Sequence, residues 1–224
     1  MAKLTFLGHA SFLLEEEEGK ETLIFDPFLN ENPLAPQKAH DIKASYILVS
    51  HAHFDHHAET YDIARANDAT IISTAEIAFE ASDKGLNAHP LNIGGKHSFP
   101  FGWVKCTLAL HSAGTSGGHP CSFVVNYYGS NIFFGGDTGF FSDMKLIGEL
   151  TPLEVALLPI GDNFTMGIEE AVLAASYLNA PKVIPYHYNT WPFIEVDPEE
   201  FKKKVEDKAN VQCIILKPGE NYSF

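Results

Sequence analysis

The sequence predicts an α/β fold, α+β in arrangement, in which two β-sheets pack face to face and helices cover both outer faces as a four-layer αββα sandwich. Two observations support this. Several expected strands are apolar along their whole length, so both faces of the sheets must be covered. In addition, strands followed by strand–helix alternation occur twice, roughly in residues 1–95 and 96–224. No linker rich in Pro, Gly or Ser separates these halves, so a single domain of residues 1–224 is expected.

The first half begins with apolar or alternating runs that are separated by Gly and by charged turns, a pattern typical of strands. A fully apolar run, ASYILVS, follows, and then two helices flank a short strand, the second helix ending at Gly85. The expected elements are strands at residues 4–8, 11–16, 22–28 and 44–50, a helix at 58–67, a strand at 70–74 and a helix at 75–85.

The second half returns to strands, two of which are joined by the turn-forming pair Gly129-Ser130. Helices then alternate with short apolar strands up to the end of the chain. The expected elements are strands at 87–93, 103–111, 121–128 and 131–137, a short helix at 141–150, a strand at 155–161, a helix at 167–179, a strand at 182–188, a helix at 198–208 and a strand at 212–218.

Composition limits the classes of function. With 224 residues, 45% of them hydrophobic, the chain can build a substantial core. No apolar stretch approaches the roughly 20 residues that a membrane-spanning helix needs, and the N-terminus does not resemble a secretory signal, so a cytoplasmic protein without membrane contact is expected. The formal charge of −14 argues against extended nucleic-acid binding. Three scattered cysteines, Cys106, Cys121 and Cys213, indicate neither a disulfide framework nor a thiolate metal site.

The stretch VSHAHFDHH, residues 49–57, places four histidines and an aspartate directly after a buried strand. His51 and His53 are two apart in extended backbone and therefore face the same side. Asp55 and His56 follow where the chain turns into a helix, so they can lie beside the first pair and face a second ion. Imidazole nitrogen and carboxylate oxygen are ligands that borderline divalent metals prefer. Coordination would satisfy groups that are otherwise costly to bury, so the pattern H-x-H-x-D-H predicts a metal site.

With this signature the sequence resembles a metallo-β-lactamase superfamily hydrolase, and the resemblance implies further single His, Asp and His ligands at later strand ends. His111, Asp137 and His187 occur there in the expected order. The resemblance implies that Asp137 bridges two divalent ions, which are zinc, manganese, iron or nickel. The implied ligands are His51, His53 and His111 for the first ion, and Asp55, His56 and His187 for the second.

Within that superfamily the chain is most similar to the small bacterial metal-dependent hydrolases (UPF0173-like), a group related to ascorbate-6-phosphate lactonases. The motifs that carry this similarity are FLGHASFLLE, IFDPF, GGDTG and TMGIEEA, together with the signature. By this similarity His9 lies close to the metals, where it is assigned with Asp55 to catalysis. Asp26 is expected to hold a ligand in place.

Two divalent ions about 3.5 to 4 Å apart would lower the pKa of a bridging water and supply hydroxide, which Asp55 would orient. The expected function is hydrolysis of an ester-type bond in a small anionic substrate, with phosphodiesters and phosphorylated lactones first. A glyoxalase II-like thioester hydrolase keeps the same ligands and stays an alternative, as does a non-catalytic metal-binding protein. A flavodiiron-type oxidoreductase would typically carry glutamate at position 53 and an added flavodoxin domain. A homo-oligomer stays open.

Several other residues have ordinary explanations. His57 is expected to begin a helix, and Thr165 to cap one. His119 lies in the Gly-rich stretch GTSGGHPC and is expected on an exposed loop, although it could also reach the substrate. Nothing in the sequence around His40, His89 and His97 recommends them as ligands.

Overall fold

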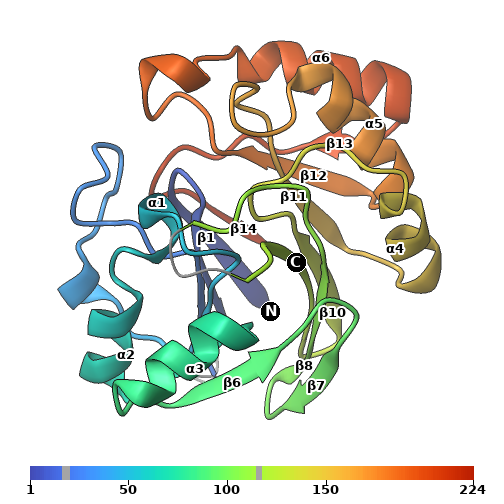
Figure 1. The fold of residues 1–224 in the computed structure, drawn as a ribbon. Coiled ribbons are helices and arrows are strands. Elements are labelled where there is room, and N and C mark those ends of the chain that lie inside the picture. The colour runs from blue at the N-terminus through green and yellow to red at the C-terminus, as the bar shows by residue number, and fades with distance from the viewer. Residues whose placement is uncertain (17–20, 115–117) are drawn as a thin grey trace.

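The structure is a computed structural model that describes residues 1–16, 21–114 and 118–224. Two seven-stranded sheets lie face to face, and helices cover the outer face of each (Figure 1). This confirms the predicted αββα class. The strand orders are β14-β1-β2-β3-β4-β5-β6 in the first sheet and β13-β12-β11-β10-β9-β8-β7 in the second. Each sheet is antiparallel at one side and parallel at the other, so several strand ends point to the same edge.

The first sheet takes its strands from the first half of the chain and from the C-terminal strand. They are β1 (Ala2–Gly8), β2 (Ser11–Glu16), β3 (Leu23–Phe25), β4 (Tyr46–Leu48), β5 (Thr70–Thr74), β6 (Ala88–Leu91) and β14 (Asn221–Ser223). The helices of this half are the 3-10 turn η1 (Ala39–Asp41), α1 (Phe54–His57), α2 (Thr60–Asn67) and α3 (Ala75–Asp83). Helices α2 and α3 pack against β4, β5 and β6.

The second sheet is built from the remaining strands. They are β7 (Lys96–Phe99), β8 (Gly102–Leu108), β9 (Cys121–Tyr127), β10 (Ser130–Phe134), β11 (Val155–Pro159), β12 (Lys182–Tyr186) and β13 (Gln212–Cys213). The helices are α4 (Met144–Leu150), α5 (Ile168–Leu178), the 3-10 turn η2 (Pro192–Ile194) and α6 (Pro198–Ala209). Helix α5 packs on β11 and between α4 and α6.

Three apolar clusters fill the layers. The central one joins the inner faces of both sheets, with Phe12 from β2 in edge contact with Phe134 of β10 and Tyr186 of β12. A second lies between the second sheet and helices α4 to α6, and a third between the first sheet and helices α2 and α3. Burial of these side chains, at roughly 25 cal/mol per Å² of apolar surface, is the main stabilising contribution. It holds the two sheets together, so that their strand ends meet at one edge of the sandwich.

Several details differ from the sequence prediction. Strand β7 was not expected, and the C-terminal strand β14 leaves the second half to pair with β1 of the first sheet. The expected strands before His111 and Asp137 end three residues earlier, at Leu108 and Phe134, because the uncharged residues before each ligand continue the sequence pattern after the ladder hydrogen bonds stop. His111 and Asp137 therefore lie in loops just beyond their strands.

The helix expected at 58–67 is interrupted. The chain is already helical from Phe54 to His57, and α2 begins only at Thr60. The break occurs because Glu59 is drawn toward the loop after β3, where its carboxylate accepts hydrogen bonds from Leu29 N (2.7 Å) and Asn30 N (3.2 Å). His57 accordingly ends α1 and does not begin a helix. In the described ranges, no helix has the length and apolar character to span a membrane.

Candidate metal centre

The loops at one edge of the sandwich bring the seven predicted ligands together. His51 and His53 follow β4, and Asp55 and His56 sit on α1, which starts at once after them. His111, Asp137 and His187 follow β8, β10 and β12 respectively. Parallel and antiparallel strands of both sheets thus end at the same place, and side chains far apart in sequence converge there.

The first three histidines form a close triangle. His51 Nε2 lies 2.9 Å from His53 Nδ1, which lies 3.2 Å from His111 Nε2. At most one proton can lie between two facing nitrogens, so three converging nitrogens are best satisfied by a cation that all three coordinate. His51 is buried, whereas His53 and His111 are half-buried at the mouth of the site.

The second group surrounds the Asp55 carboxylate. Asp55 Oδ2 lies 3.7 Å from His56 Nε2, 3.9 Å from His187 Nε2 and 3.0 Å from His9 Nε2. These four side chains offer ligand atoms that all lie within 4.8 Å of one another. The histidines of this group are completely or almost completely buried.

Asp137 lies between the two groups. Its Oδ2 atom is 3.1 Å from His187 Nε2, 3.6 Å from His111 Nε2 and 4.0 Å from His51 Nε2, while Oδ1 is 3.3 Å from His56 Nε2. One carboxylate therefore faces histidines from both sets. This is the placement that a bridging ligand requires.

The donor set fits divalent cations. His56 Nε2, His187 Nε2 and Asp137 Oδ1 are buried, and none has a hydrogen-bond partner although carboxylate oxygens lie near both histidines. Leaving buried polar atoms unpaired costs free energy, so these atoms are placed for coordination. Among the described residues, no Lys or Arg forms an ion pair with Asp55 or Asp137. Positive charge must come from imidazolium or from metal.

The electrostatics agree with this view. Burial lowers the pKa of His51 and of His111, which keeps their nitrogens free of protons as metal ligation requires. Burial alone would raise the pKa of Asp137, but the neighbouring His187 and His56 hold it well below its usual range. Burial likewise disfavours a charged His56, yet Asp137 and Asp26 raise its pKa well above its ordinary value.

Asp26 holds two of the candidate ligands in place. Its Oδ2 atom lies 2.7 Å from His56 Nδ1, and Ser50 donates to Asp26 from its backbone N (2.7 Å) and from Oγ (2.5 Å). Ser50 Oγ also lies 2.9 Å from His51 Nδ1. Both histidines are thereby fixed with Nε2 toward the centre. The sequence pointed to Asp26 but not to Ser50.

His9 is placed differently from a residue that touches substrate. It is fully buried, with Nε2 3.0 Å from Asp55 Oδ2 and Nδ1 2.8 Å from Thr190 Oγ1, so both ring nitrogens are in use. Burial, aided by His187, lowers its pKa to about 3, so the ring is neutral and donates to Asp55. In this geometry His9 positions Asp55, and the catalytic role expected for His9 stays a prediction.

The backbone is strained at this edge. His9, Asp26 and His187 have φ angles of 58°, 40° and 57°, in the left-handed region that non-glycine residues rarely adopt. His187 N donates to His9 O at 2.9 Å, which links two of these residues. The strain concentrates where side chains must turn sharply out of strands toward one point.

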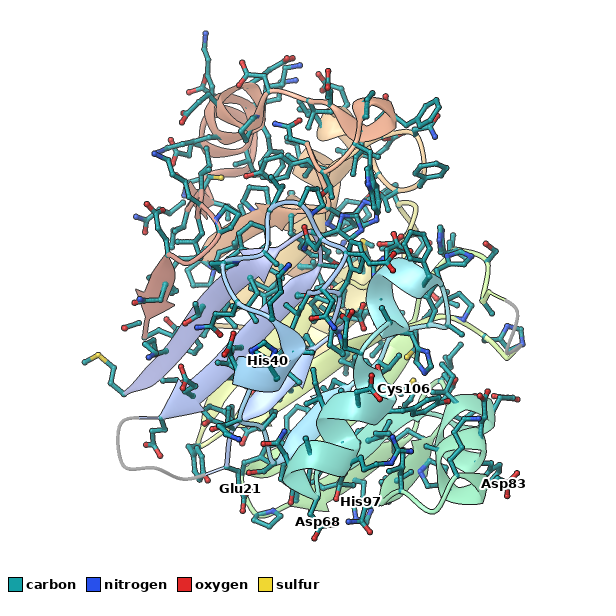
Figure 2. The ribbon with its side chains drawn as sticks, turned by 90° about the vertical axis from the view of Figure 1, so that its left-hand side faces the viewer. Glu21, His40, Asp68, Asp83, His97 and Cys106 are labelled. Carbon is teal, nitrogen blue, oxygen red and sulfur yellow. The ribbon has the colours of Figure 1, made fainter. Side chains whose placement is uncertain are left out.

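The remaining histidines lie away from the centre. His119 is exposed, and His89 and His97 contact each other with ring centroids 3.9 Å apart. Figure 2 shows His40 over the first-sheet strands on the face toward the viewer, and His97 at the lower edge of the molecule. Thr165 is not a helix cap, because α5 begins after Gly167, whose N–H donates to Glu170 Oε2 at 2.9 Å.

A cavity of about 510 Å³ opens over the candidate ligands. His53, Asp55, His111, Asp137 and His187 line its floor. Its walls include four aromatic side chains that the sequence reasoning missed, namely Phe54, Phe164, Trp191 and Phe193. No spacing pattern marks them, because they come from three separate segments that only the fold brings together.

Comparison with known proteins agrees with the fold. Residues 21–188 match the family model of the beta-lactamase superfamily domain. The chain therefore belongs to the metallo-β-lactamase superfamily of hydrolases. A UPF0173 metal-dependent hydrolase of Natranaerobius thermophilus is 50% identical, covering 98% of both chains, and one of Desulforamulus reducens is 49% identical over 97% of this chain and 98% of its own.

A solved structure gives the same result. Igni18, a metallo hydrolase from the archaeon Ignicoccus hospitalis, is 36% identical and superimposes with a TM-score of 0.92, covering 100% of this chain and 99% of its own. These relatives identify the chain as a member of a family of metal-dependent hydrolases. The predicted relation to ascorbate-6-phosphate lactonases stays a prediction.

Proposed function

We propose that the chain is a hydrolase that uses two divalent ions to cleave an ester-type bond, within one domain of residues 1–224. The observation that carries the proposal is the position of Asp137, whose carboxylate faces histidines of both groups at 3.1 to 4.0 Å. The proposed ligands are His51, His53 and His111 for one ion, Asp55, His56 and His187 for the other, and Asp137 for both.

When bound, the two ions would supply Lewis-acid chemistry, which activates water near neutral pH and polarises the bond under attack. The chain's own residues do the rest. Asp55 is held by His9, and its second oxygen is free to accept a proton or hydrogen bond from the attacking water. Asp26 keeps His56 and, through Ser50, His51 in orientation. The cavity admits the substrate from the side of His53 and His111.

The test is a metal and activity measurement on one preparation. Protein purified without chelator is expected to carry two divalent ions per chain and to hydrolyse at least one member of a panel of esters, lactones, phosphodiesters and thioesters. His51→Ala is expected to lose metal and activity. His40→Ala is the matched control, because His40 is 81% exposed and, among the described residues, pairs only with Asp41. A His51→Ala variant with both metals and full rates would refute the ligand assignment.

Two alternatives are separated by the same panel. Turnover of a glutathione thioester above all other substrates would favour the glyoxalase II-like function. Two ions per chain with no turnover of any member would favour a non-catalytic metal-binding protein.

A further inference from the structure

The walls of the cavity over the candidate metal centre are aromatic. Phe54, Phe164 and Phe193 line it although they are 62%, 51% and 75% exposed, and Trp191 lies with them. Among the described residues only one other phenylalanine, Phe79, is exposed to this degree. Large apolar side chains exposed around one cavity, rather than scattered, mark a binding surface for apolar groups.

The loop that carries Phe164 is fixed from two sides. Asp162 N donates to Met166 O at 3.0 Å, which closes the loop on itself. Met166 N donates to Thr138 O at 3.0 Å, which ties the loop to the residue after Asp137. This part of the wall is therefore formed before any substrate arrives, so that binding loses little conformational entropy.

Another part of the wall is a cluster of aromatic rings in tilted and edge-on contact. Trp191 contacts Phe28 and Phe54 with ring centroids 5.9 and 6.1 Å apart, and it meets His9 at 4.7 Å. Phe54 also contacts Phe28 at 5.6 Å. Edge-on and tilted contacts of this kind favour a defined ring orientation. The indole thus presents a fixed surface to the cavity.

The cavity offers little to a phosphate. No Lys or Arg is among the described residues that line it, and its floor holds two carboxylates, Asp55 and Asp137. Residues 115–117, outside the described part, are Thr, Ser and Gly and carry no charge. Besides the candidate ligands, the polar groups on the walls are the Ser112 hydroxyl and the Trp191 indole N–H. Side chains that recognise phosphate are normally Arg or Lys, and the described walls hold neither, so a phosphate would be held by the ions alone.

We propose that the substrate is an uncharged ester or lactone that carries an aromatic ring, or an apolar group of similar size, seated between Phe54, Phe164, Phe193 and Trp191. This rests on the proposed function and names its substrate class. Water adds to the carbonyl carbon, the bond from that carbon to the ester oxygen breaks, and the departing oxygen takes up a proton. An ester gives a carboxylic acid and an alcohol, and a lactone gives one hydroxy acid. No further reactant is consumed.

Matched substrates test the two parts of this proposal. Dihydrocoumarin and δ-valerolactone share a six-membered lactone and differ by a fused benzene ring. Phenyl acetate and 4-acetoxybenzoate share an acetyl ester and differ by a carboxylate. Dihydrocoumarin has a better, phenolic leaving group than δ-valerolactone, so each kcat/KM is divided by the rate constant of alkaline hydrolysis of the same substrate. After this correction, metal-loaded protein is expected to prefer dihydrocoumarin and phenyl acetate by about tenfold or more, since ring burial and the absence of a cationic partner both act on binding. Bis(4-nitrophenyl) phosphate represents the phosphodiester alternative.

Substitutions of the cavity-lining phenylalanines test whether these residues cause the preference for the aromatic lactone. Phe164→Ala and Phe193→Ala are expected to reduce the preference for dihydrocoumarin over δ-valerolactone, each by about three- to tenfold. Phe79→Ala is the matched control, because Phe79 on α3 is 59% exposed and does not line the cavity. It is expected to keep the wild-type preference.

Binding is measured without turnover through Trp191. The chain has two tryptophans, so Trp103→Phe leaves Trp191 as the one fluorescent indole. Acetanilide, an uncharged amide with the shape of phenyl acetate, is expected to change its fluorescence saturably, whereas acetamide is not. Phe193→Ala is expected to weaken this binding by about three- to tenfold.

The outcomes distinguish failure of the proposed aromatic substrate class from failure of the proposed hydrolase function. Preference for 4-acetoxybenzoate or for the phosphodiester, or a Trp191 signal that acetanilide leaves unchanged, would overturn the aromatic substrate class while the hydrolase function stands. Failure of the metal-loaded protein to hydrolyse any ester or lactone, with saturable acetanilide binding intact, would instead refute the proposed function.

Discussion

The candidate metal centre has two sides that are built differently. The inner side consists of Asp55, His56 and His187, and the outer side of His51, His53 and His111. On the inner side, His56 and His187 are buried, and His56 is held by the buried carboxylate of Asp26. On the outer side, His53 and His111 are half-buried, and their nearest polar contacts are to each other, to His51 and to the exposed Ser112. The inner side is fixed by packing, whereas two of the three outer histidines, His53 and His111, depend on the ion for their order. The inner ion is therefore expected to bind more tightly than the outer one.

Asp137→Asn gives the largest expected effect, because Asp137 faces both sides. The amide removes a negative charge from a position within 4.0 Å of four histidines. We expect loss of both ions at micromolar metal and a fall in kcat/KM of about 10³-fold or more. Metal analysis and kinetics measure this. Full retention of two ions would show that the sides do not share this ligand.

His111→Ala tests the outer side alone. It removes one corner of the triangle with His51 and His53 and leaves Asp55, His56 and His187 untouched. The expected result is one tightly held ion per chain, with activity reduced by about 100-fold or more. His119→Ala, which changes an exposed histidine of the same connection, is the control and is expected to keep two ions. Loss of both ions from His111→Ala would contradict the view that the inner ion binds independently of the outer one.

Asp26→Asn weakens the support of the inner side. Its Oδ2 atom lies 2.7 Å from His56 Nδ1, and a neutral amide there orients the ring less firmly. We expect metal affinity to fall about 10- to 100-fold, as is usual when the partner of a ligating histidine is changed. A competition titration with a chelator would measure it. Unchanged affinity at both sites would mean that packing alone holds His56.

Ser50→Ala gives the smallest expected effect. It removes the hydroxyl that links Asp26 to His51 Nδ1 and leaves the direct contact between Asp26 and His56. The affinity of the outer ion is expected to fall by about threefold to tenfold, and that of the inner ion less. Stepwise chelator titration resolves the two. A larger loss at the inner site would reverse the proposed comparison.

The convergence of the candidate ligands could be predicted because their sequence pattern is local or repeats a simple rule. The signature from His51 to His56 lies in six residues, and His111, Asp137 and His187 each follow an apolar run. The rule that a polar side chain after an apolar run lies at a strand end predicted the edge of the sandwich where these residues meet. Two of the strands nevertheless end three residues before the candidate ligand. The run of uncharged residues continues past the ladder, and a sequence shows hydrophobicity more clearly than hydrogen bonding.

The residues that hold the candidate ligands in place, and those that line the cavity above them, could not be predicted in the same way. Ser50 and Thr190 act through single hydrogen bonds to His51 and His9, and serine or threonine near a strand end is common without such a role. The aromatic wall comes from α1, the loop after β11 and the segment around η2, with no spacing that connects them. The pairing of β14 with β1 was also missed, since a three-residue strand carries little periodic signal.

The most direct test of two ions sharing Asp137 is anomalous diffraction from crystals of the zinc-loaded protein. If two ions share Asp137, two peaks are expected, one enclosed by His51, His53 and His111 and the other by Asp55, His56 and His187. The Asp137 carboxylate is expected to contact both. A single peak, or two peaks of which one lies away from Asp137, would contradict this sharing.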